Sequence, residues 1–139
     1  MSNRVKVMIV DDESVVRQAY TRILASDQCA VDAVDNGQDA LRKLEREPCD
    51  VVLLDLRMPG MDGLSVLRAI KQRWPEVEVI VITGYAALDS AKASVALGAF
   101  DYLAKPVGPD EVIHAMHSAL LHKGWALRAD TPAACATLQ

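Results

Sequence analysis

Four apolar runs in this sequence each lead into side chains that carry a charge or a hydroxyl group. These side chains are Asp11, Asp12, Asp55, Thr83 and Lys105. Three carboxylates in a partly desolvated site repel one another unless a cation joins them. Oxygen ligands select a hard cation, so we expect Mg²⁺, with Mn²⁺ as a substitute. A lysine and a hydroxyl group suit phosphoryl oxygens, so the set predicts a site for a phosphoryl group on Asp55.

The apolar runs that carry these side chains are typical of buried strands, because they are short and rich in β-branched residues. We expect strands over residues 5–10, 30–34, 51–55, 77–83 and 100–104. Apolar residues at helical spacing predict helices over residues 14–25, around Ala40, Leu41 and Leu44, and over 64–74, 87–97 and 110–121.

Alternating strands and helices with short connections predict an α/β fold with a doubly wound, five-stranded parallel sheet and five helices. We expect the flavodoxin-like strand order 2-1-3-4-5. The first and third strands are then neighbours, which brings Asp11, Asp12 and Asp55 together at the carboxyl edge, where ligands bind in such sheets.

The fourth predicted helix differs from the others because small residues dominate its sequence. Its expected inner face consists of Ala87, Ala91 and Ala96, with Leu88, Val95 and Leu97 as the larger members. A face of this kind buries little apolar area, so we expect the helix to be weakly held and able to move.

The bulk properties favour one globular domain of 139 residues, 51% of them hydrophobic. The net charge of -4 argues against direct nucleic-acid binding, which needs clustered basic residues. Three widely spaced cysteines indicate cytosolic thiols, and no apolar run suggests a signal peptide or a membrane span, so we expect a cytoplasmic protein. We expect residues 1–122 to form the domain and residues 123–139 a poorly ordered tail or a linker.

Five motifs in order resemble the response-regulator receiver domain of two-component signalling, the chemotaxis-regulator-like fold, over about residues 4–122. The motifs are Asp11-Asp12, Asp55, Met58-Pro59-Gly60-Met61-Asp62-Gly63, Thr83-Gly84 and Gly98-Ala99-Phe100-Asp101-Tyr102-Leu103-Ala104-Lys105-Pro106. The resemblance implies that Asp55 accepts a phosphoryl group from the phosphohistidine of a kinase or from a small donor. It also implies that Asp12, Asp55 and the backbone carbonyl of Arg57 hold Mg²⁺, with Asp11 acting through water.

The same resemblance implies a switch. Lys105 would contact the phosphoryl oxygens, Thr83 would move to hydrogen-bond them, and Tyr102 would change position with Thr83. The Lys105–Pro106 peptide bond would be cis. The fourth helix, fifth strand and fifth helix would form the output face, which controls a downstream protein or a linked output domain, or forms a homodimer. The implied partner is a sensor histidine kinase or a phosphotransfer protein. The chain would act as a signalling phospho-acceptor rather than an enzyme.

Several alternatives stay open at the level of sequence. Aspartyl-phosphate phosphatases also use a strand-end Asp, but they need a second Asp two residues later, where this chain has Arg57. A flavodoxin-like nucleotide binder needs a Gly/Ser/Thr loop after the first strand, where this chain has Asp11-Asp12-Glu13. A receiver used only for docking or dimerisation is a third alternative. His114 and His117 share a helical spacing, but with no third ligand a solvated face is favoured over a zinc site.

Overall fold

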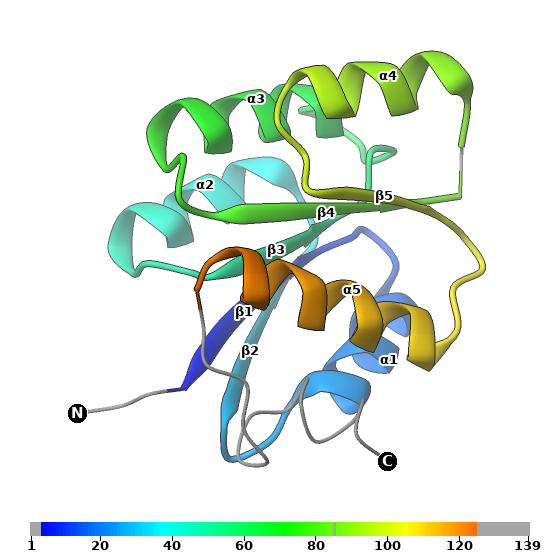
Figure 1. Ribbon diagram of the computed structural model, residues 1–139. Coiled ribbons are helices and arrows are strands. Elements are labelled where there is room, and N and C mark those ends of the chain that lie inside the picture. Colours follow the sequence, from blue (N-terminus) through cyan, green and yellow to red (C-terminus); the bar gives the residue numbers. More distant parts are fainter. Residues whose placement is uncertain (1–3, 85, 125–139) are drawn as a thin grey trace.

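The computed structural model describes residues 4–84 and 86–124, and within them five parallel strands form one sheet (Figure 1). The strands are β1 (Val5–Val10), β2 (Cys29–Val34), β3 (Val51–Leu54), β4 (Glu78–Thr83) and β5 (Asp101–Ala104). The helices are α1 (Ser14–Leu24), α2 (Gly37–Arg46), α3 (Gly63–Arg73), α4 (Leu88–Ala96) and α5 (Pro109–His122). The order β2-β1-β3-β4-β5 confirms the predicted fold class.

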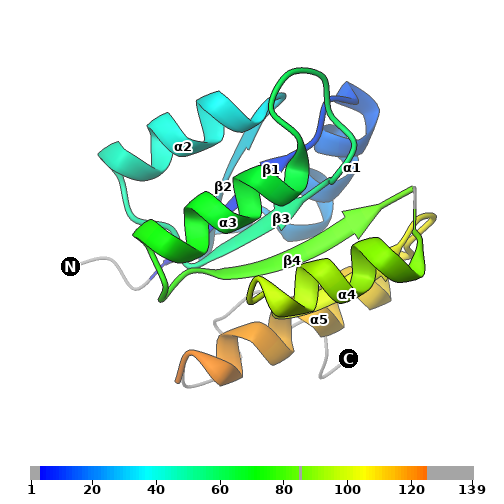
Figure 2. The same ribbon diagram turned by 90° about the horizontal axis from the view of Figure 1, so that it is seen from above.

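Helices cover both faces of the sheet, because alternate residues of the central strands point to opposite sides. Val7 and Ile9 of β1 pack into the apolar cluster that α1 and α5 cover. Met8 and Val10 of the same strand pack into the cluster under α2 and α3. Figure 2 shows α2, α3 and α4 side by side across their face of the sheet. All four β3 residues are buried, as the apolar run predicts for an inner strand.

The register of the inner strands sets the position of the acidic residues. Val10 pairs with Leu54, so the residues that follow, Asp11 and Asp55, leave the sheet side by side. The backbone N–H of Asp55 donates to the carbonyl of Val10 at 2.9 Å, which extends the pairing by one step.

The prediction for the inner face of α4 is correct for Leu97, which packs against the cluster under α2 and α3, but wrong for the two other large members. Leu88 and Val95 are 70% and 66% exposed, while Ser94 is the fully buried residue of this helix. Small residues of α4 occur on every side of the helix. The sequence therefore contains no apolar stripe strong enough to indicate how the helix is rotated about its axis. The expectation of weak anchoring agrees with this arrangement, since the largest apolar side chains of α4 face solvent.

None of the described helices is long and apolar enough to cross a membrane. Of the predicted tail, residues 125–139 lie outside the described part of the chain. The division into a domain over 1–122 and a tail or linker over 123–139 therefore stays a prediction.

Candidate functional site

Three carboxylates meet at the carboxyl edge of the sheet, at the ends of β1 and β3. Asp11, Asp12 and Asp55 each offer an oxygen atom, and these atoms lie within 4.8 Å of one another. Asp11 and Asp55 are only 2% and 5% exposed, whereas Asp12 faces solvent. Their proximity follows from the register of β1 and β3, as the predicted strand order required.

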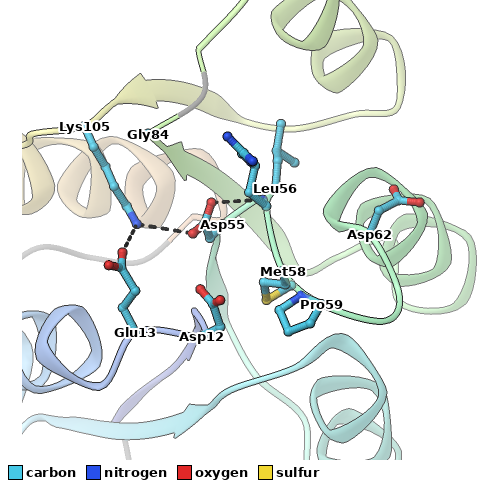
Figure 3. Close-up of a pocket in the computed structure, with 10 residues that line it drawn as sticks. Asp12, Glu13, Asp55, Leu56, Met58, Pro59, Asp62, Gly84 and Lys105 are labelled. Atoms are coloured by element: carbon cyan, nitrogen blue, oxygen red, sulfur yellow. Dashed lines mark hydrogen bonds and ion pairs between the residues drawn. The ribbon is translucent and has the colours of Figure 1, made fainter.

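Lys105, which follows β5, contacts Asp11 and Asp55, and Figure 3 shows its contacts with Asp55 and with Glu13. Its Nζ donates to Asp11 Oδ2 at 2.8 Å and to Asp55 Oδ2 at 3.2 Å, and it lies 3.6 Å from Glu13 Oε1. Burial alone lowers the pKa of Lys105, but the hydrogen bond to Asp11 and the charges of Asp11 and Asp55 together outweigh burial and raise it. The ammonium group is therefore charged at neutral pH.

Asp11 is the most enclosed carboxylate of the group. Its Oδ1 accepts a hydrogen bond from the backbone N–H of Glu13 at 2.9 Å. Burial raises the pKa of Asp11, and the hydrogen bonds from Lys105 and Glu13 only partly oppose this effect. One lysine does not neutralise three carboxylates, so the site keeps an excess of negative charge that favours a cation.

An open cavity of about 750 Å³ lies beside Asp55. The residues that line it are Asp12, Glu13, Asp55, Lys105, Leu56, Arg57, Met58, Pro59, Asp62 and Gly84. The backbone N–H of Arg57 donates to Asp55 Oδ1 at 3.1 Å, which fixes the carboxylate at the cavity wall. Carboxylate oxygens without nitrogen or sulfur ligands form a donor set that fits Mg²⁺ and leaves space for water and phosphoryl oxygens.

Thr83 and Lys105 are tied together by their backbones. Thr83 is fully buried at the end of β4, and its carbonyl accepts a hydrogen bond from the backbone N–H of Lys105 at 2.9 Å. The Lys105–Pro106 peptide bond is cis.

Tyr102 lies apart from the cavity walls, on β5 beside the start of α4. Its hydroxyl group is 2.7 Å from Ser90 Oγ and 3.4 Å from the backbone nitrogen of Ala87. Sequence reasoning did not single out Ser90 or the Glu13–Lys105 contact. Glu13 directly follows the acidic pair, which was a usable signal, whereas Ser90 becomes meaningful only once the rotation of α4 is known.

Comparison with known proteins agrees with this fold and site. The family model of the response regulator receiver domain matches residues 7–117. The DNA-binding transcriptional regulator NtrC of Escherichia coli (strain K12) is 42% identical over 116 residues, which cover 84% of this chain and 25% of NtrC. The response regulator protein PilR of Pseudomonas aeruginosa is 39% identical over 105 residues, covering 76% of this chain and 24% of PilR.

Solved structures show the same likeness. A CheY-like receiver domain protein from Methanospirillum hungatei JF-1 matches with a TM-score of 0.84 and 27% identity, over 87% of this chain and 97% of that one. NtrX from Brucella abortus matches with a TM-score of 0.81 and 28% identity, over 87% of this chain and 28% of that one.

The fold is a doubly wound sheet, and three carboxylates and a lysine lie at the carboxyl ends of its strands. Both features agree with the family match, which covers most of the chain. The chain belongs to the response regulator receiver domain family, the signalling modules of two-component systems. It spans about a quarter of the length of the curated relatives NtrC and PilR.

Proposed function

We propose that Asp55 is the phospho-acceptor of this receiver domain and takes a phosphoryl group from the phosphohistidine of a histidine kinase, from a phosphotransfer protein or from a small donor. The observation that carries this proposal is the hydrogen bond from Lys105 to Asp55 at the wall of an open acidic cavity. The phosphoryl group would arrive at a carboxylate that already has a charged donor beside it.

The transfer is a displacement at phosphorus. A carboxylate oxygen of Asp55 forms a bond to phosphorus, and the bond from phosphorus to the histidine nitrogen breaks. The imidazole leaves in its neutral form because its other ring nitrogen carries a proton. Lys105 keeps its hydrogen bond to Asp11 and exchanges Asp55 for a phosphoryl oxygen, so its charge stays in the site. Mg²⁺, when bound by Asp12, Asp55 and the backbone carbonyl of Arg57, with Asp11 through water, offsets the added negative charge.

The switch begins at Thr83, which moves to hydrogen-bond the phosphoryl oxygens. This residue and Gly84 lead towards α4, whose outer side chains face solvent, so the movement biases the least anchored helix. Tyr102 moves with it, and the surface of α4, β5 and α5 changes.

The changed surface then controls a downstream protein or a covalently linked output domain in the cytoplasm, or forms a homodimer. The chain catalyses only its own phosphorylation and dephosphorylation. The general acid of aspartyl-phosphate phosphatases has no counterpart here, since Arg57 occupies its position and donates a backbone hydrogen bond to Asp55.

Intact mass measurement after incubation with acetyl phosphate and Mg²⁺ tests the acceptor. We expect the wild type to gain one phosphoryl group and the Asp55→Asn variant to gain none. Asp62→Asn is the matched control, because Asp62 also lines the cavity but caps α3. Equal mass spectra for the wild type and Asp55→Asn would remove the central claim.

Isothermal titration calorimetry with Mg²⁺ tests the metal site separately from the acceptor. We expect Asp12→Ala to abolish binding near neutral pH, whereas Lys105→Ala retains the metal but accepts the phosphoryl group slowly. An unchanged titration of Asp12→Ala would exclude the role assigned to that residue.

A further inference from the structure

The first turn of α4 is held from outside the helix by Tyr102. Ala87, the residue that precedes the helix, has no side chain able to cap it. Its backbone N–H instead donates to Ser90 Oγ at 3.3 Å and to the Tyr102 hydroxyl oxygen at 3.4 Å. Ser90 Oγ donates back to the carbonyl of Ala87 at 3.0 Å and lies 2.7 Å from the Tyr102 hydroxyl. Ser90 therefore joins the start of α4 to β5.

One turn further along the same face, Ser94 has the opposite character. It is fully buried, and its hydroxyl finds no hydrogen-bond partner among residues 4–84 and 86–124. A buried hydroxyl without a partner destabilises the arrangement that encloses it. Ser90 thus stabilises the observed position of α4, whereas Ser94 destabilises it.

The other side chains of α4 contribute little to holding the helix in this position. Leu88 and Val95 are mostly exposed, so their burial does not hold the helix in place. In a helix with so few apolar anchors, one hydrogen bond and one unpaired hydroxyl are large relative to the remaining contacts.

We propose that Ser90 and Ser94 set the switching equilibrium of this receiver: Ser90 locks α4 to Tyr102 in the unmodified chain, and the buried Ser94 hydroxyl favours its release. The proposal rests on the proposed function, because it assigns the regulation of the same switch to two residues outside the phosphoryl site. A ligand that requires α4 to move binds more weakly in proportion to how firmly the starting arrangement is held.

Beryllium trifluoride, a mimic of the phosphoryl group, measures this balance without phosphate turnover. We expect Ser90→Ala to bind the mimic two- to tenfold more tightly than the wild type in the presence of Mg²⁺, the range expected for the loss of one net hydrogen bond. We expect Ser94→Ala to bind it more weakly by a similar factor, because removing the unpaired hydroxyl stabilises the unmodified arrangement.

The two variants control for each other. Both replace serine with alanine in the same short helix, so any gain in helix propensity is shared and does not produce opposite shifts. A double-mutant cycle of Ser90→Ala with Tyr102→Phe should be non-additive, because each change removes the same hydrogen bond. Equal affinities for the wild type and both serine variants, shifts in the same direction, or an additive cycle would overturn the proposal.

Hydrogen exchange without the mimic provides a second measurement on the folded protein. We expect the hydrogen-bonded amides of α4, which begin at Ala91, to exchange faster in Ser90→Ala and slower in Ser94→Ala, with the sheet unchanged. Unaltered exchange in α4 would contradict the lock. If the wild type itself failed to bind the mimic, the proposed function would fail instead, so the two outcomes are distinct.

Discussion

At the scale of single residues, burial and the neighbouring charge have opposite effects on the pKa of Asp11. Burial raises its pKa above the ordinary value of 3.8 despite the hydrogen bond from Lys105. Below that value both the folded and the unfolded chain carry the proton, whereas above it the unfolded chain loses the proton first. Folding stability therefore falls as the pH rises from 3.8 through the folded pKa of Asp11.

We predict that Asp11→Asn is more stable than the wild type at pH 7 when divalent ions are chelated, and that the difference shrinks as the pH falls towards 4. Asn keeps the shape of the side chain but removes the buried charge. Urea unfolding across this pH range measures the effect. A wild type as stable as the variant at pH 7 would mean that Lys105 fully compensates for the burial of Asp11.

The contribution of Asp62 to folding stability has the opposite pH dependence. Its carboxylate accepts the backbone N–H of Ser65 at 3.0 Å at the start of α3, and this hydrogen bond lowers its pKa below 3.8. The stabilisation is complete above 3.8 and disappears as the pH falls through the lowered pKa. We predict that Asp62→Ala costs about 1 kcal/mol of unfolding free energy at pH 7. Asp62→Asn retains a capping oxygen, so it should unfold close to the wild type at neutral pH.

At the scale of elements, the start of α3 presses against the end of β3. A Cβ atom on Gly63 would lie 2.3 Å from Leu56 Cα and 2.7 Å from the carbonyl oxygen of Asp55. These are backbone atoms, which cannot turn aside as a flexible side chain can. The glycine therefore lets α3 begin directly beside the candidate acceptor.

We predict that Gly63→Ala lowers the unfolding free energy by about 1–3 kcal/mol and slows phosphorylation by acetyl phosphate, because the added methyl group displaces the backbone of Asp55. Gly84→Ala is the matched control for stability, since its Cβ would meet nothing closer than Lys105 Cδ at 3.8 Å. Urea unfolding of both variants, with phosphorylation rates for Gly63→Ala, measures the effect. A Gly63→Ala protein as stable as Gly84→Ala would show that α3 can move away at little cost.

The elements also show why some features could be predicted and others could not. The strands β1, β3 and β4 are mostly apolar and are buried on both faces, so their position and order follow from pattern and spacing. The helix α4 has no comparable pattern, and its rotation depends on contacts with Tyr102 that local sequence does not encode. Ser90 could not be identified as a contact of Tyr102 for the same reason. Asp11, Asp55 and Lys105 could be placed together because parallel strands align their carboxyl ends.

At the scale of the whole molecule, a second polar cluster lies at the amino-terminal ends of the strands, whereas Asp55 lies at their carboxyl ends. Glu78, the buried first residue of β4, contacts His122 Nδ1 at the end of α5 and lies 3.8 Å from Lys71 Nζ of α3. Lys71 Nζ also donates to the carbonyl oxygen of Val77 at 2.7 Å. This cluster links α3, β4 and the end of α5, so it anchors α5 at the end of the sheet away from the phosphoryl site.

We predict that His122→Ala lowers the unfolding free energy by about 1 kcal/mol, because a buried carboxylate loses a hydrogen-bond partner while Lys71 remains. His114→Ala, an exposed position on the same helix, should stay within about 0.5 kcal/mol of the wild type. Both variants should accept a phosphoryl group from acetyl phosphate at the wild-type rate, since the cluster and Asp55 lie at opposite ends of the strands. A His122→Ala protein with unchanged stability would show that Lys71 alone satisfies Glu78. Slow phosphorylation of that variant would instead show that the position of α5 influences the acceptor across the sheet.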